Sequence, residues 1–264
     1  MSLGCGNKVS KSIPQRVVSL VPSVTEILFA LGAEERLVGV TAFCDYPEEA
    51  RLKPKVGDFS NPSLERILRL EPDIVFATAP EQLRIVGKLR NLGITTEVVN
   101  PESVGAVIET VRRIGGLVHR NDKAEEIIDE IVEERRRLGD LVKKVRRRPR
   151  VYVELDVNPL FTVGRGSFVN ELVELAGGEN IVESGMPYLT VNPEIIVAND
   201  PEVIVLVYSG RKEEVSSRIG WNDISAIRNG RVYDDVDEDL IARPGPRCIK
   251  GALELFKRFH PVIQ

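Results

Sequence analysis

The chain is poor in the residues that build metal sites and disulfide frameworks. Its 264 residues include only two histidines, His119 and His260, and three cysteines, Cys5, Cys44 and Cys248. Two histidines so far apart argue against a first-row metal held by protein ligands alone, so we expect no metal site. The cysteine spacing fits no zinc pattern. Cys44 could pair with Cys248 only if the fold brings the two side chains together.

Long apolar runs and nucleotide-binding motifs are also missing. No run approaches the roughly 18 apolar residues of a membrane-spanning helix. A dehydrogenase would carry Gly-x-Gly-x-x-Gly after its first strand, but the turn Val21–Val24 has no glycine and Gly164–Gly166 lacks the third one. Neither Ser19 nor Ser167 has a credible histidine partner for nucleophilic catalysis. We therefore expect no catalytic residue, no cofactor and no enzymatic activity.

The acidic charge balance excludes a further class of partner. Lysines and arginines number 36 against 40 aspartates and glutamates, which gives a formal net charge of −4. This balance argues against a nucleic-acid partner. The length predicts one large domain or two modest ones, at roughly 150 residues per domain.

What is present is an alternation of short apolar strands with helices. This order predicts an α/β fold with mostly parallel sheets covered by helices. The predicted strands are Arg16–Val21, Leu37–Thr41, Asp73–Ala77, Ile94–Val99, Arg150–Leu155, Val203–Tyr208 and Arg231–Tyr233. The predicted helices between them are Thr25–Leu31, Leu64–Leu70, Gln82–Leu92, Phe168–Ala176 and Ile249–Phe259.

One long helical stripe, Asp122–Arg148, divides this pattern in two. Acids crowd its first half and bases its end, an order that complements the helix dipole. A helix of about 25 residues is roughly 37 Å long, and Pro149 is expected to end it. The predicted parts are an N-terminal tail (1–13), an N-terminal α/β lobe (14–120), a connecting helix (121–148) and a C-terminal α/β lobe (149–264).

Two segments on opposite sides of the long helix match each other. Glu26–Glu34 resembles Glu171–Glu179, and Glu65–Val75 matches Glu194–Ile204 without a gap. In the second pair a glutamate opens a short helix and a Pro-acid dipeptide follows seven residues later. Two matches in the same order predict two similar lobes.

The N-terminal segment around Cys5 has a pattern of its own. Leu3-Gly4-Cys5-Gly6, followed by a polar stretch, resembles the cleavage end of a bacterial lipoprotein signal without its apolar region. This pattern predicts a lipid anchor on Cys5. The alternative is a surface cysteine in a tail.

Several motifs together resemble the substrate-binding proteins of bacterial ABC importers, in the group with a helical connection that serves vitamin B12, siderophores and haem. The resemblance covers residues 14–262, and Asp45–Pro47 with Leu64–Val75 is most similar to vitamin B12-binding members. The motifs that carry it are Arg16–Glu26, Val38–Val40, Asp45–Pro47, Leu64–Asp73 and Arg243–Arg247. It implies a monomer that captures a corrinoid in a cleft between the lobes. That monomer would deliver the small molecule to an ABC permease dimer with ATPase subunits. It further implies a periplasmic or cell-surface location, with the membrane reached only through a lipid anchor.

The same resemblance implies which residues bind ligand. Those positions are Phe43 and Phe59 in the N-terminal lobe and Tyr188, Asp239 and Arg243 in the C-terminal lobe. Aromatic faces can cover a corrin, and the Asp–Arg combination can bind its amide or phosphate edge. The alternative is that both phenylalanines are ordinary core residues. Thr78 departs from the family, because vitamin B12-binding relatives can carry an aromatic there, which implies a looser pocket or a smaller corrinoid.

Glu65 and Glu194 match the family's docking glutamates, which meet arginines on the two permease subunits. The alternative for either residue is a helix-start acid favoured by the dipole. A ferric siderophore or haem remains an alternative ligand. A metal-ion receptor of this architecture would use several histidines.

Overall fold

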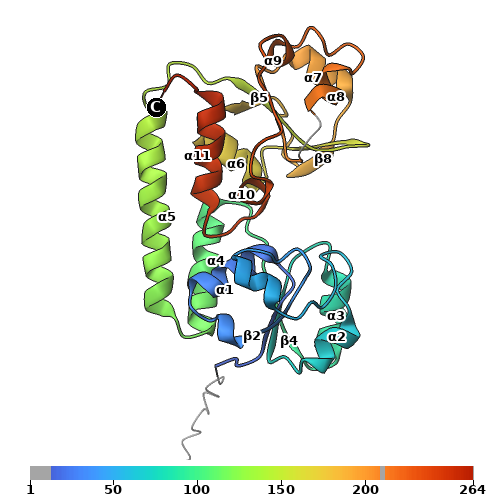
Figure 1. Cartoon of the computed structure of the whole chain (residues 1–264), viewed down its shortest axis with the longest axis vertical. Helices are drawn as coiled ribbons and strands as arrows, with labels where there is room; N and C mark the ends of the chain where they lie inside the picture. Colours follow the sequence, from blue (N-terminus) through green and yellow to red (C-terminus); the bar gives the residue numbers. More distant parts are fainter. Residues whose placement is uncertain (1–12, 209–211, 264) are drawn as a thin grey trace, which may run out of the picture. The chain divides into compact units, whose positions relative to one another are not determined.

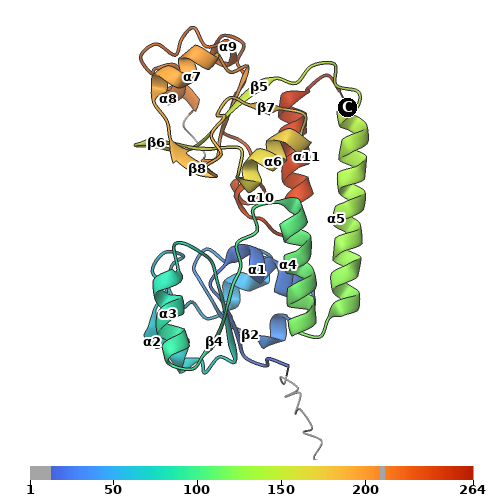
Figure 2. The same cartoon turned by 180° about the vertical axis from the view of Figure 1, so that it is seen from behind.

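A computed structural model describes residues 13–208 and 212–263, so Cys5 lies outside the described residues. The chain folds into two compact units (Figures 1 and 2). The first contains residues up to Val99 together with Arg113–Lys123. The second contains Asn100–Arg112 and the chain from Ala124 onward.

The first unit is built on a parallel sheet. In its described part four strands lie in the order β2 (Leu37–Val40), β1 (Val17–Ser19), β3 (Ile74–Ala77) and β4 (Thr95–Val98). Helices α2 (Leu64–Arg69) and α3 (Leu83–Asn91) cover one face, and α1 (Pro22–Ala30) covers the other (Figure 2). Because both faces are covered, β1 and β3 are buried along their whole length.

The second unit is built on a mixed sheet, which agrees with the prediction of mostly parallel strands. Over its described residues the order is β10 (Val232–Tyr233), β9 (Val203–Leu206), β5 (Arg150–Val157), β6 (Leu160–Val163) and β8 (Tyr188–Thr190), with β7 (Glu179–Asn180) also paired to β5. β6 pairs antiparallel with both β5 and β8, and the other strand pairs are parallel. Asn158-Pro159 forms the tight turn between β5 and β6, a residue pair that favours turns.

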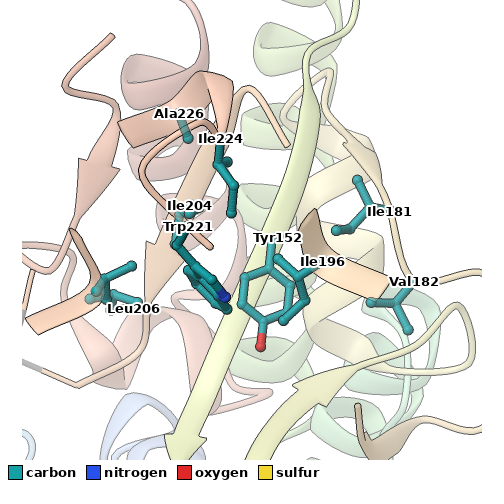
Figure 3. Close-up of a cluster of buried hydrophobic side chains, with 10 residues drawn as sticks. Tyr152, Ile181, Val182, Ile196, Ile204, Leu206, Trp221, Ile224 and Ala226 are labelled. Carbon is teal, nitrogen blue, oxygen red and sulfur yellow. The ribbon is translucent and has the colours of Figure 1, made fainter. Parts of the chain in front are cut away.

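Helices cover both faces of this sheet as well. On one face lie α7 (Pro193–Asn199), α8 (Lys212–Ser216) and α9 (Ser225–Arg228), over a core that includes Tyr152, Ile204 and Trp221 (Figure 3). On the other lie α6 (Phe168–Leu175), α10 (Glu238–Ala242) and α11 (Cys248–Phe259) (Figure 1). A Cβ on Gly178 would lie within 3 Å of both Val151 on β5 and Phe259 on α11, so glycine permits this close approach.

Two antiparallel helices, α4 (Val104–Leu117) and α5 (Asn121–Val142), stand between the α/β segments of the chain. The sequence analysis missed α4, although its buried valines Val104, Val107 and Val111 have helical spacing. The predicted long helix is confirmed, but it ends at Val142 and not at Arg148. Like charges crowd residues 143–148, which disfavours further helical turns, and Arg147 instead pairs with Glu202 at 2.8 Å.

Candidate functional site

The strand order of the first sheet has a switch point at the carboxyl end of β1. The chain leaves the inner strand β1 for β2 on one side and then crosses to β3 on the other. In open α/β sheets ligands bind outside the carboxyl ends of the strands at such a switch point. Phe43 follows β2, and Thr78 follows β3 directly.

A buried amide ties this edge together. Gln82, just before α3, donates from Nε2 to the carbonyl oxygens of Leu20 (3.0 Å) and Phe59 (2.7 Å). Its Oε1 accepts the N–H of Thr78 at 3.0 Å. One side chain therefore holds the ends of β1 and β3 and the segment that carries Phe59. The sequence analysis missed Gln82, and no motif marked it.

The two predicted aromatic residues of this unit are not core residues of the ordinary kind. Phe43 is 56% exposed, so the alternative that it fills the core is wrong. Phe59 is half-buried. Tyr46 is also exposed in the same loop, within the Asp45–Pro47 motif that could have indicated it. Thr78 is buried, so its side chain is not among the exposed groups at this edge of the sheet.

In the second unit an exposed and a half-buried aromatic ring pair across the antiparallel strands β6 and β8. Tyr188 opens β8 and is 42% exposed. Its ring stacks on Phe161 of β6, with centroids 6.3 Å apart and planes 23° apart. The sequence analysis missed Phe161 because it predicted no strand there. The stack holds the Tyr188 ring against the sheet.

The structure brings Asp239 of α10 (Glu238–Ala242) together with Arg243, the residue that follows this helix. Arg243 Nη2 lies 2.7 Å from Asp239 Oδ1, and the side chains are 12% and 39% exposed. Asp239 lies in the first turn of α10, and Arg243 is the extended residue that follows its last turn. The side chain of Asp237 begins α10 by accepting the N–H groups of Asp239 and Leu240.

A second ion pair lies at the carboxyl end of β9, and the sequence analysis missed it. Glu154 of β5 is fully buried, and both of its oxygens lie 2.7 Å from Arg218. The Tyr208 hydroxyl donates to the same carboxylate. The Arg218 guanidinium also covers the Trp221 ring, 4.6 Å from its centroid.

Two tyrosines beside Glu154 are held in their protonated form. Burial is the main cause that raises the pKa of Tyr152, and the nearby Glu154 adds to it. Burial and the hydrogen bond to Glu154 also raise the pKa of Tyr208. Within the described part of the chain, the buried Tyr152 hydroxyl has no hydrogen-bond partner. Its ring meets Trp221 edge to face (Figure 3).

The two predicted docking glutamates occupy matched helices. Glu65 lies in the first turn of α2, and Glu194 lies in the first turn of α7. Both are exposed, and each helix is anchored two residues later by a fully buried isoleucine, Ile67 or Ile196. Their neighbours differ, because Glu65 pairs with Arg69 one turn on. Over residues 13–208 and 212–263, Glu194 has no ion-pair partner.

The ends of these helices repeat the same hydrogen bonds in both units. Arg16 donates from Nε to the carbonyls of Leu70 (2.8 Å) and Glu71 (3.2 Å) after α2. Arg150 donates in the same way to Asn199 and Asp200 after α7, at 3.1 Å each. The matched acids of the two Pro-acid dipeptides accept the backbone N–H of these arginines, Asp73 from Arg16 and Glu202 from Arg150.

The backbone repeats as well. Glu71 and Asp200, which match in the duplication, both adopt the left-handed conformation, with φ of 43° and 40°. Such a conformation is uncommon for non-glycine residues. The geometry therefore confirms that the sequence match marks two similar structural units.

The described cysteines and possible metal ligands form neither a disulfide nor a metal site. Of the cysteines that the structure describes, Cys44 and Cys248 are buried in different units and neither is in a disulfide. No group of three or more His, Cys, Asp or Glu side chains suited to a metal ion occurs among the described residues. None of the described helices is both long and apolar enough to cross a bilayer.

Comparisons with known proteins agree with this architecture. Residues 17–238 match the family described as "Periplasmic binding protein". The ABC transporter substrate-binding lipoprotein YvrC of Bacillus subtilis (strain 168) is 32% identical over 95% of this chain and 82% of its own length. A vitamin B12-binding protein of Salmonella choleraesuis (strain SC-B67) is 30% identical over 91% of this chain and 88% of its own. A periplasmic haem-binding protein from Pseudomonas aeruginosa superposes with a TM-score of 0.85 at 25% identity, over 95% of this chain and 94% of its own.

Proposed function

The chain belongs to the periplasmic binding protein family and is a substrate-binding protein of an ABC importer, and on that premise we propose that its cargo is a corrinoid of the vitamin B12 type. Members of this family are non-enzymatic transport components that work with permease and ATPase subunits. The cargo is bound and released unchanged.

Exposed aromatic rings in both units carry the proposal. Phe43 and Tyr188 are each exposed over two fifths or more of their surface. Large exposed rings are typical of a recognition surface, and Phe43 lies just beyond β2, at the carboxyl edge of the first sheet. Such rings fit the flat face of a macrocycle or of its nucleotide base. Phe59 and the Phe161 ring stacked on Tyr188 extend these surfaces.

The Asp239–Arg243 pair supplies polar recognition. Arg243 is largely buried while Asp239 is more exposed, so the pair combines a carboxylate acceptor with a guanidinium donor. This combination suits the uncharged amides at a corrinoid's rim, which both donate and accept hydrogen bonds. We assign these two residues, with the aromatic ones, to cargo binding.

Haem or a ferric siderophore is the alternative cargo, and the superposition on a haem-binding protein favours it. Haem carries two propionates, which call for guanidinium groups that are free to bind carboxylate. Here Arg243 and Arg218 are each already paired with a carboxylate. The raised pKa of Tyr208 also disfavours a phenolate ligand to iron. Both observations support the corrinoid.

Delivery and location complete the proposal. Glu65 and Glu194 contact the permease, one from each unit, and the chain acts as a monomer. Relatives include a lipoprotein, and we assign the lipid anchor to Cys5. The anchored protein would act outside the cytoplasm.

Parallel titrations test the cargo. Calorimetry with cyanocobalamin, cobinamide, hemin and a ferric siderophore should give micromolar to nanomolar affinity for a corrinoid, or about −8 to −12 kcal/mol. Phe43→Ala should weaken that binding about tenfold or more, because a stacking face is lost. Leu52→Ala removes another exposed apolar side chain of the first unit and should leave affinity unchanged. Tight hemin or siderophore binding without corrinoid binding would contradict the proposal.

A further inference from the structure

The buried carboxylate of Glu154 stands where the other unit has an apolar side chain. Arg16 and Arg150 match in the duplication, so Leu20, four residues after Arg16, corresponds to Glu154. Both positions are fully buried: Leu20 directly follows β1, and Glu154 lies within β5, where it pairs with Leu206 at the carboxyl end of β9. The fold therefore accepts leucine at this position. A buried ion pair costs desolvation that an apolar residue does not.

The contacts of Arg218 show what the carboxylate does. Glu154 takes two N–H groups of Arg218, at 2.7 Å each, in the fork geometry with which arginine grips a carboxylate. One face of the guanidinium lies over Trp221. Glu154 therefore occupies the edge of Arg218 that would otherwise bind a carboxylate ligand, and it cancels the charge.

The outer side of this cluster is accessible. The Arg218 side chain is 20% exposed, and Tyr208, which follows the end of β9, is half-buried. The carboxyl ends of parallel strands are where α/β sheets bind ligands. The Tyr208 hydroxyl is already donated to Glu154, so the donors that this charge-neutral cluster presents are the remaining N–H groups of the Arg218 guanidinium.

We propose that Glu154, Arg218 and Tyr208 form a charge-neutral contact site for cargo that selects an uncharged, amide-rich ligand rim and disfavours carboxylate-bearing ligands. The outer N–H groups of Arg218 donate to amide carbonyls of the cargo. An anionic ligand meets no unbalanced positive charge there and has to compete with Glu154 for the guanidinium. Specificity of this kind comes from the repulsive element as much as from the attractive one. This inference rests on the proposed function and names the residues that select a corrinoid over haem and other carboxylate-bearing ligands.

The test changes the charge of the cluster and keeps its shape. Glu154→Gln leaves Arg218 unbalanced, so affinity for hemin, the carboxylate-bearing probe, should rise about fivefold or more. Affinity for cyanocobalamin, which has no net charge, should change less than about threefold. The double variant Glu154→Gln with Arg218→Gln is neutral again and should bind hemin as weakly as the wild type.

A matched control separates a local effect from net charge. Glu254 forms a partly buried ion pair with Arg258 near the end of α11. Glu254→Gln makes the same substitution and the same change in net charge, and it should leave hemin affinity unchanged. Thermal melts establish that each variant is folded. If Glu154→Gln does not fold, Tyr208→Lys adds a positive charge at the rim and leaves the buried pair intact. It should give the same gain.

Two results would overturn the inference. One is a hemin affinity that is the same in wild type and Glu154→Gln, or in Tyr208→Lys where that variant replaces it. The other is an equal gain in Glu254→Gln, which would assign the effect to net charge. Failure of the proposed function gives a different result, because the wild-type protein would then bind no corrinoid at all. Wild-type corrinoid binding with no response to the charge at position 154 would refute this inference alone.

Discussion

Reversing the charge of both docking glutamates should uncouple transport from cargo binding. Glu65 and Glu194 are exposed, and the helices that carry them are held by the buried Ile67 and Ile196. Lysine at either position therefore leaves the packing intact. The cost to stability is confined to the surface, and Glu65→Lys adds a like-charge contact with Arg69 of about 0.2–0.5 kcal/mol.

The magnitude of the docking effect follows from the exposure of these side chains. An exposed ion pair contributes about 0–1 kcal/mol, so the glutamates steer and orient the complex more than they hold it. Reversal turns each attraction into repulsion and should abolish productive docking when both change. Glu194 has no ion-pair partner among the described residues, whereas Glu65 is partly neutralised by Arg69. Glu194→Lys alone should therefore reduce transport more than Glu65→Lys alone.

The assay is uptake into vesicles that carry the cognate permease and its ATPase subunits, with cargo affinity measured by calorimetry on the same variants. The double variant should keep cargo affinity within about threefold, a change below about 1 kcal/mol, and should lose transport. Glu49→Lys with Glu130→Lys makes the same change in net charge at exposed acids elsewhere and should transport normally. Normal transport by the docking double variant, or loss of its cargo binding, would refute the assignment.

Three further predictions concern stability and the aromatic pair. Glu71→Gly should stabilise the protein by about 0.5 kcal/mol in urea unfolding, because it relieves a left-handed backbone. Asp200→Gly should instead destabilise it by about 1 kcal/mol, because the Asp200 carboxylate accepts two hydrogen bonds from Ser225. Equal effects would contradict this reasoning. Burial lowers the pKa of His260 in the folded protein, so as the pH falls the unfolded chain takes up the His260 proton before the folded chain does. Stability should be full above about pH 6.5 and should fall as the pH drops below it. His260→Gln should flatten that part of a melting-temperature profile, and an unchanged profile would exclude His260 as the source. Phe161→Ala should weaken corrinoid binding severalfold although Phe161 matches no motif, because the stacked Tyr188 ring loses its support.

Local patterns in the sequence determined most of the strands and most of the helices of this protein. Each predicted strand is confirmed to within two residues at its ends, because short apolar runs rich in β-branched residues favour strands by their local composition. The matched Glu65 and Glu194 helices were also predictable. Their capping residues, Ser63 and Asn192, and their Pro-acid endings are local features.

Elements that depend on partners were harder to predict. The antiparallel strands β6 and β8 are short, and their pairing with β5 depends on a turn whose direction no periodicity reveals. The short helix α10 has only five residues, too few for a periodic pattern. The end of α5 was misplaced because Arg147 finds its partner, Glu202, far along the chain.

The candidate site divides along the same line. The sequence, through its motifs, indicated Phe43, Phe59, Tyr188, Asp239 and Arg243 as residue types suited to a large amphipathic ligand, and these assignments stay predictions. Only the tertiary structure placed Gln82 between three chain segments, and only it joined Glu154 to Arg218, 64 residues apart. Such contacts depend on which strand ends become neighbours. Neighbouring strand ends are set by the packing of whole sheets, so no local stretch of sequence contains that information.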